Sequence, residues 1–288
     1  MRWLSFERDG AITFGYVTSD GLGVVDAGAN SAHATLREVI AAGELEVLAQ
    51  ACGDEADLAL EGLTFAPTIT DPKKILCVGL NYKAHQEETG RGGEGVPTIF
   101  ARFAAAQVAH KQPMIRPRES NTLDFEGEIA MIIGKGGRRI PRAQALDHVV
   151  GFGIYNDGSV REYQRKTSQF TPGKNFAATG GFGPWMMTSD EVGDPYAMEL
   201  TTRLNGEVMQ NATADLLVHN FEEIIEFCST FIELEPGDVI VTGTPGGVGS
   251  ARKPPIFMDH GDEIEIEVKP IGKLFNPVVG ESGKRAAP

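Results

Sequence analysis

Three acidic side chains alternate with apolar ones in residues 123–133, which read LDFEGEIAMII. Asp124, Glu126 and Glu128 occupy every second position, and an apolar run follows directly. In a β-strand these three side chains point to one face, whereas in a helix Glu126 would point away from the other two. Like charges spaced about 7 Å apart beside a core must be protonated or share a cation. The pattern indicates either a half-exposed acidic strand or a metal site.

Another acidic residue, Asp157, lies where the apolar run VVGFGIY ends and is a candidate for a third metal ligand. A hard divalent ion such as Mg²⁺ prefers oxygen ligands and commonly binds two or three carboxylates together with water. No His or Cys stands at ligand spacing beside these acids, which argues against zinc. Taken alone, the pair Asn156-Asp157 is also compatible with an ordinary turn.

The elements that must position these acids are mostly strands. Short apolar runs and turn signals predict a β-meander in residues 3–25, and helical spacing predicts one or two short helices in residues 35–52, interrupted at Gly43. We therefore expect a small N-terminal β/α domain at residues 1–70 and a larger domain at residues 71–288.

The larger domain is predicted to contain few helices. Asn220 with Glu223 forms a capping pattern before an apolar periodic run, and Ser159 with Glu162 has the same form. Strands and helices do not alternate regularly, so we expect an α+β fold, mainly β and mostly antiparallel, rather than a doubly wound sheet or a TIM barrel. The expected strands are residues 74–80, 123–134, 149–155, 199–205 (paired across an Asn-Gly turn), 239–242 and 263–269.

Composition excludes several classes of protein. The chain has 288 residues, of which 41% are hydrophobic, so it can bury a large core. A formal charge of -14 argues against nucleic-acid binding. No signal peptide and no membrane-spanning apolar run is evident, so we expect a cytoplasmic protein that does not bind membranes.

Five ordered blocks resemble the fumarylacetoacetate hydrolase (FAH) superfamily over about residues 75–268, in particular its bacterial acylpyruvase or 2,4-dioxo acid hydrolase members. The blocks are KILCVGLNYKAH, LDFEGEIAMIIGK, GFGIYNDGSVREYQ, TPGKNFAATGGFGPWM and LEPGDVIVTGTPGGVG. The resemblance implies an FAH-type mixed β-sandwich roll for the larger, catalytic domain, and a homodimer.

The resemblance also implies which residues bind a metal. Glu126, Glu128 and Asp157 would hold one Mg²⁺ or Mn²⁺, and Ca²⁺ could replace either in a crystal. Asp124 would be a support residue. In the family, the metal chelates a small oxo acid substrate and stabilises its enolate.

Three further residues match catalytic positions of the family. Asn81 is expected to cap a short helix that places His85 and Glu88 within hydrogen-bonding reach, so that the pair can take a proton from water. Lys174 would stabilise developing negative charge. Outside this block order, a solvated helix face would be the simpler interpretation of His85 and Glu88.

Other matches concern the substrate. Arg161 and Gln164 match a substrate-side pair, and Gly243 and Thr244 match a loop that holds the substrate carboxylate. Arg102 replaces a lysine found in many members, which puts specificity for the far end of the substrate in question. The glycine-rich residues 89–96 are expected to act as a lid.

The implied reaction is hydrolytic C–C cleavage of a 2,4-dioxo acid such as an acylpyruvate, releasing pyruvate or a similar oxo acid. Tautomerisation, isomerisation and decarboxylation of 2-oxo acids use the same metal-enolate site and are the alternative. A non-catalytic metal-binding protein is a third interpretation, which the joint presence of His85, Glu88 and Lys174 argues against.

Overall fold

Most strands of the protein join one large sheet. In the computed structural model, which describes residues 1–92, 95–281 and 283, this sheet has eleven strands. Their order is β4-β3-β2-β1-β13-β11-β10-β16-β5-β6, and β7 pairs with β13 beside this path. Neighbours are antiparallel except for the pairs β16/β5 and β13/β7. The strands are β1 (Arg2–Arg8), β2 (Ala11–Val17), β3 (Gly23–Val25), β4 (Leu58–Ala59), β5 (Ile75–Gly79), β6 (Thr98–Arg102), β7 (Gln107–Val108), β10 (Gly127–Ile133), β11 (Val149–Asp157), β13 (Gly180–Thr188) and β16 (Val239–Val241).

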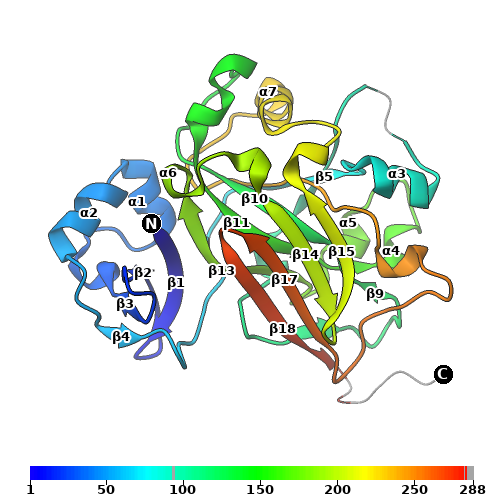
Figure 1. Cartoon of the computed structure of the whole chain (residues 1–288), viewed down its shortest axis with the longest axis horizontal. Helices are drawn as coiled ribbons and strands as arrows, with labels where there is room; N and C mark the ends of the chain where they lie inside the picture. The colour runs from blue at the N-terminus through cyan, green and yellow to red at the C-terminus, as the bar shows by residue number, and fades with distance from the viewer. Residues whose placement is uncertain (93–94, 282, 284–288) are drawn as a thin grey trace.

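A second sheet of five strands, ordered β15-β14-β17-β18-β8, packs against the first (Figure 1). Its strands are β8 (Met114–Arg116), β14 (Glu199–Leu204), β15 (Glu207–Thr213), β17 (Glu263–Lys269) and β18 (Gly272–Gly280). Met131 of the large sheet and Ile266 of the small one belong to one buried core. The expected Asn-Gly hairpin is present, with positive φ at Asn205 (52°) and Gly206 (82°), as a type I′ turn requires. The predicted fold class, α+β and mainly β, is confirmed.

The N-terminal strands are continuous with the large sheet. β1 pairs with β13, where Trp3 lies opposite Met186, and β2 and β3 extend the sheet from there. Two helices follow as predicted, α1 (Leu36–Ala42) and α2 (Leu45–Cys52). Gly43 ends α1 with a φ of 71°, a conformation in which glycine is preferred. The domain boundary at residue 70 remains a prediction.

The remaining helices are short except for one. They are α3 (Lys83–Thr89), α4 (Arg161–Gln164), α5 (Thr171–Lys174), α6 (Ser189–Val192) and α7 (Phe221–Phe231). Short 3-10 helices occupy Ala27–Asn30, Ala104–Ala106, Arg142–His148, Pro195–Ala197, Ala214–Leu216 and Gly249–Ala251. The predicted capping box of Asn220 and Glu223 is present at the start of α7 and satisfies backbone donors that would otherwise be unpaired.

Two predicted helix caps are wrong. Ser159 lies in a short strand, β12 (Ser159–Val160), and its hydroxyl donates to the carbonyl oxygen of Asp157 (2.9 Å), so α4 begins without a side-chain cap. The amide of Asn81 donates to the carbonyl oxygens of His219 (3.0 Å) and Thr242 (2.7 Å) instead of capping α3. In both cases a polar side chain has a different partner from the one its local sequence suggests.

Residues 123–133 do not form one strand. β9 (Leu123–Asp124) pairs with β12, whereas β10 pairs with β11 and β16. At the break, the N–H of Glu126 donates to Asn156 Oδ1 (3.0 Å), so its buried backbone donor has a partner. The prediction of one continuous strand is therefore wrong, while the predicted burial of both faces of β10 is confirmed.

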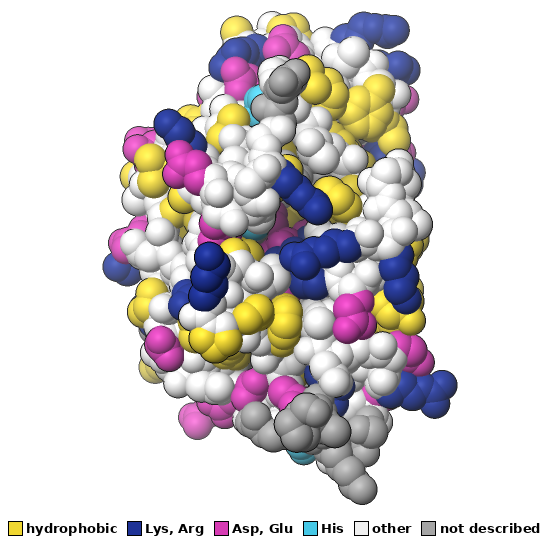
Figure 2. All heavy atoms as spheres, turned by 90° about the vertical axis from the view of Figure 1, so that its right-hand side faces the viewer, with side chains coloured by type: hydrophobic (Ala, Val, Ile, Leu, Met, Phe, Trp, Pro, Cys, Tyr) yellow, Lys and Arg dark blue, Asp and Glu magenta, His cyan; other side chains and the backbone are white. Residues whose placement is uncertain are grey.

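A cavity of about 380 Å³ opens on the face that carries α3 and α4. Figure 2 shows Lys and Arg side chains gathered around the opening and acidic side chains inside it. Within the described residues, no helix has both the length and the apolar character needed to cross a membrane.

Candidate metal centre and active site

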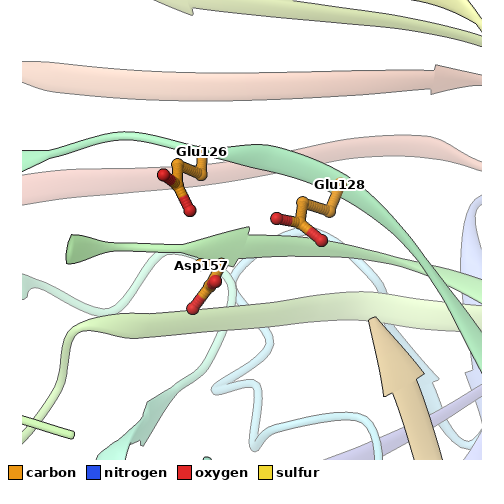
Figure 3. A group of neighbouring side chains, drawn as sticks. All are labelled: Glu126, Glu128 and Asp157. Atoms are coloured by element: carbon orange, nitrogen blue, oxygen red, sulfur yellow. The ribbon is translucent and has the colours of Figure 1, made fainter. Parts of the chain in front are cut away.

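Three carboxylates meet inside this cavity (Figure 3). Their oxygens, one each from Glu126, Glu128 and Asp157, lie within 4.8 Å of one another, and all three residues are buried. The antiparallel pairing of β10 with β11 puts Gly127 opposite Asn156, and the N–H of Asp157 donates to the carbonyl oxygen of Glu126 (2.8 Å). The structure thus brings together the three acids predicted as metal ligands.

Two cationic side chains bind this group. Lys174 Nζ lies 2.5 Å from Glu126 Oε2 and 2.6 Å from Asp157 Oδ2. Arg161 Nη1 lies 2.6 Å from Glu126 Oε1, and its Nε lies 2.7 Å from Asp124 Oδ2. Both cations are buried, so these ion pairs are shielded from solvent.

Asp124 lies outside the group of three carboxylates. Besides Arg161, it accepts hydrogen bonds from the backbone N–H groups of Gly249 (2.8 Å) and Ser250 (2.9 Å). It therefore connects the arginine to the segment that forms another wall of the cavity. This geometry suits the supporting role expected for it.

Arg102 is a third buried cation of the site. Its Nη1 lies 2.6 Å from Asp157 Oδ1 and donates to the carbonyl oxygen of Gly158 (3.0 Å), while Nη2 donates to Thr179 Oγ1 (2.9 Å). The departure from the family pattern at Arg102 therefore lies beside a carboxylate of the metal group. The Arg102 guanidinium holds the Asp157 carboxylate in place and does not line the cavity.

Burial and neighbouring charge shift the pKa values of the site in different directions. Burial, with the charges of Asp157 and Glu126, raises the pKa of Glu128 well above its usual range. Burial alone would also raise the pKa of Glu126, but Arg161 and Lys174 outweigh it and hold that pKa low. Burial alone would lower the pKa of Lys174, but the charges of Asp157 and Glu126 outweigh it and raise that pKa. Glu128 is thus the carboxyl that an additional cation would ionise.

The charge balance of the site fits a divalent cation. Four buried carboxylates face three buried cations, so ionising Glu128 would leave one negative charge for a bound cation to balance. These residues are Asp124, Glu126, Glu128 and Asp157, and Arg102, Arg161 and Lys174. Carboxylate oxygens are the ligands that Mg²⁺ and Mn²⁺ prefer, and within the described residues this is the single acidic group compact enough to share an ion.

A histidine–carboxylate pair lies on another wall of the cavity. His85 Nδ1 is 2.7 Å from Glu88 Oε1, and Glu88 Oε2 accepts the backbone N–H of Gly247 (2.7 Å). Both side chains come from α3, three residues apart, as predicted. Because Nδ1 is engaged by the carboxylate, Nε2 is the ring nitrogen left for proton exchange.

Three of the four expected substrate-binding residues line the cavity, and Gly243 does not. Arg161, Gln164 and Thr244 line the cavity, and Arg161 Nη1 donates to Gln164 Oε1 (2.9 Å). The N–H of Gly243 donates to Glu128 Oε2 (2.6 Å), so it is committed to a carboxylate of the metal group. In the loop 89–96, expected to be a lid, positions 93 and 94 lie outside the described residues.

Sequence reasoning missed residues that hold the site together. Gln210 accepts the N–H of Gly127 (3.0 Å) and donates to Thr244 Oγ1 (2.7 Å), so it ties β10 to the loop after β16. No local signal marks Gln210, which lies on β15 of the other sheet. Asn156, which binds the N–H of Glu126, was visible beside Asp157 but was interpreted only as part of a turn.

This fold and site define a class of protein, namely enzymes that place a carboxylate metal site against a mainly β scaffold. Residues 74–279 match the family model described as "Fumarylacetoacetate (FAA) hydrolase C-terminal". The chain belongs to this family, the fumarylacetoacetate hydrolases, and is an enzyme of that superfamily.

Similar proteins of this family are named for different activities. The oxaloacetate tautomerase FAHD2A, mitochondrial, of Bos taurus is 39% identical over 272 residues, covering 92% of this chain and 87% of the relative. A structure of fumarylacetoacetate hydrolase from Exiguobacterium antarcticum is 33% identical, with a TM-score of 0.84 and coverage of 96% and 99%. Maleylpyruvate hydrolase from Sphingobium sp. SYK-6, in complex with manganese(II) and pyruvate, is 26% identical, with a TM-score of 0.81 and coverage of 97% and 99%.

Proposed function

We propose that this enzyme interconverts the keto and enol forms of a 2-oxo acid with the help of a divalent metal, and that oxaloacetate is the substrate. The observation that carries this proposal is the buried group Glu126, Glu128 and Asp157 next to the His85–Glu88 pair in one cavity. The named activity of the Bos taurus relative supports it. Hydrolysis, which the sequence favours, becomes the second candidate.

The metal group would act on the 2-oxo acid end of the substrate. Glu126, Glu128 and Asp157 would hold Mg²⁺ or Mn²⁺, which supplies a Lewis acid for the 2-oxo group and stabilises negative charge on its oxygen. Lys174 adds a positive charge that is already fixed in place before reaction. Arg161 contributes a buried Nη2 without a hydrogen-bond partner in the described part of the chain, and this donor suits the substrate carboxylate.

The proton would move through the histidine. Tautomerisation of oxaloacetate breaks the C3–H bond in one direction and forms it in the other, while the C2 oxygen gains or loses the enol proton. In the keto-to-enol direction His85 Nε2 takes the proton from C3 and delivers it to the C2 oxygen, and in the other direction it carries the enol proton from that oxygen to C3. Glu88 stabilises the imidazolium formed in between. The Gly247 N–H donates to the far oxygen of Glu88, so the carboxylate that orients the ring is itself held by the backbone.

The second candidate is hydrolytic C–C cleavage of a 2,4-dioxo acid. It is favoured by the same fixed His85–Glu88 pair, because an imidazole backed by a carboxylate can also take a proton from water. The Sphingobium relative in complex with manganese(II) and pyruvate is named a hydrolase. Decarboxylation of oxaloacetate would use the same metal group but would release CO₂.

The test follows the enol form of oxaloacetate by its ultraviolet absorbance in the presence of Mn²⁺. We expect faster ketonisation with the protein than with Mn²⁺ alone, and NMR should show no more pyruvate than Mn²⁺ alone produces. His85→Asn should lower kcat by about 10²–10⁴-fold while leaving Mn²⁺ affinity unchanged. Cleavage of an acylpyruvate to pyruvate and a carboxylic acid, with no effect on oxaloacetate, would replace this proposal with the hydrolase.

We also propose that the enzyme is a cytoplasmic homodimer, an expectation that comes from the family resemblance and from the sequence. Light scattering on the purified protein should give twice the chain mass of 30.9 kDa. A monomer mass at micromolar concentration would contradict the dimer. Fractionation of cells that express the untagged chain tests its location.

A further inference from the structure

The outer part of the cavity carries positive charge that the metal group does not neutralise. Four Lys and Arg side chains line the cavity, and two of them, Lys174 and Arg161, are buried against the carboxylates. The other two, Arg91 and Arg165, are exposed. Neither guanidinium has an acidic partner or a hydrogen bond within residues 1–92, 95–281 and 283. Two cations at the opening therefore lack an anion.

Arg165 is held on the same side of its turn as Arg161. The N–H of Arg165 donates to the carbonyl oxygen of Arg161 (3.1 Å) at the end of α4, and side chains four residues apart in such a turn are neighbours. Burial, followed by the positive charges of Arg161 and Arg91, lowers the pKa of Arg165. The three guanidiniums are thus close enough to repel one another, and a bound anion would relieve that repulsion.

Building on the proposed function, we propose that Arg165, together with Arg91, binds a second carboxylate of the substrate, so that the enzyme selects 2-oxo dicarboxylic acids over 2-oxo monocarboxylic acids. The acidic end of the cavity would take the 2-oxo acid, and the arginines would take the distal carboxylate. A guanidinium can bind a carboxylate through two parallel hydrogen bonds, which gives direction as well as charge.

The rest of the cavity suits a short carbon chain. Phe100 and Phe170 line it, and their rings meet edge to face with centroids 5.6 Å apart. They offer an apolar surface but no hydrogen bond to the middle of the substrate. The whole chain has a formal charge of -14, so the basic opening in Figure 2 is a local exception that would attract a dianion.

Two probes that cannot tautomerise distinguish how much each end of the cavity contributes to binding. N-oxalylglycine carries a 2-oxo acid end and a distal carboxylate, whereas N-ethyloxamate has the same 2-oxo acid end and a methyl group instead. Their affinities for the full-length protein with saturating Mn²⁺ are measured by calorimetry. We expect N-oxalylglycine to bind more tightly than N-ethyloxamate. Arg165→Gln should lower the affinity for N-oxalylglycine by about tenfold and leave the affinity for N-ethyloxamate unchanged. Arg165→Lys should restore part of the loss.

Lys166→Gln is the matched control. It removes a positive charge from the next residue, whose Nζ lies 3.5 Å from the centroid of the Tyr163 ring and does not line the cavity. We expect this variant to bind both probes like the wild type. The inference is overturned if N-oxalylglycine binds the wild type no better than N-ethyloxamate. It is also overturned if Arg165→Gln weakens both probes equally or neither, or if Lys166→Gln matches Arg165→Gln.

Kinetics separate this inference from the proposed function. If oxaloacetate is the substrate, Arg165→Gln should raise KM with little change in kcat, because the distal contact is the same in the ground state and the transition state. A change in kcat alone would contradict a binding role. If the wild type does not tautomerise oxaloacetate, the proposed function fails, while the difference between the two probes still decides whether the distal site exists.

Discussion

Replacing Arg102 with methionine is expected to lower the free energy of unfolding by several kcal/mol. Both Arg102 and Asp157 have fully buried side chains, and removing one partner of such a pair costs about 3–5 kcal/mol because the other charge stays buried. The variant also leaves Gly158 and Thr179 without their donor. Lys174 still contacts the second oxygen of Asp157, so we expect the lower end of this range, about 3 kcal/mol.

Urea denaturation in EDTA measures this loss, because EDTA removes any stabilisation by bound metal. Circular dichroism and the fluorescence of Trp3 and Trp185 should report the same transition, which licenses a two-state treatment. The matched control is Arg118→Met, whose pair with Glu119 (3.0 Å) is exposed and screened by solvent, so its loss should change stability much less. A loss for Arg102→Met no larger than that of the control would refute the reasoning.

Three further predictions concern metal binding, acid stability and a helix cap. Glu126→Ala should weaken Mn²⁺ binding in calorimetry by more than about 100-fold, since it removes a ligand rather than an outer contact, and unchanged affinity would contradict the site. Burial and Lys111 lower the pKa of His110 from 6.5 to about 4, so between these pH values the unfolded chain binds more protons. Unfolding free energy should therefore fall as the pH drops through this window, by up to about 3 kcal/mol, and His110→Gln should flatten that fall in urea titrations. Asn220→Ala should cost about 0.5–2 kcal/mol by breaking the capping box with Glu223, with kcat unchanged.

Local signals in the sequence correctly predicted the elements that are stabilised by residues close to one another in the chain. The turn at Asn205-Gly206 and the capping box at Asn220 involve residues within three positions of one another, and both are present. The predictions for Ser159 and Asn81 failed because their side chains bind elsewhere. Asn81 binds carbonyl groups 138 and 161 residues away in the chain, and propensity cannot detect such partners.

The candidate site was predictable as a set of residues but not as an arrangement. Alternation of acids pointed to Glu126 and Glu128, and the end of an apolar run pointed to Asp157; block order then favoured all three as ligands, and the structure gathers them. The break in the strand at Glu126 depends on a hydrogen bond to a residue 30 positions later. Arg102 reaches Asp157 over 55 positions, so its place next to the metal group follows from sheet pairing and not from its neighbours in the sequence.

The pairing of β1 with β13 has a consequence for how the chain folds during synthesis. The terminal amino group of Met1 bonds to Thr188, 187 positions later, and Trp3 lies opposite Met186. At about 5–20 residues per second, a ribosome needs roughly 10–40 s to make that length of chain. For that time the nascent N-terminal meander has an open strand edge, which is available to chaperones or to a neighbouring nascent chain. The large sheet can therefore be completed only after β13 and then β16 (Val239–Val241) have been made.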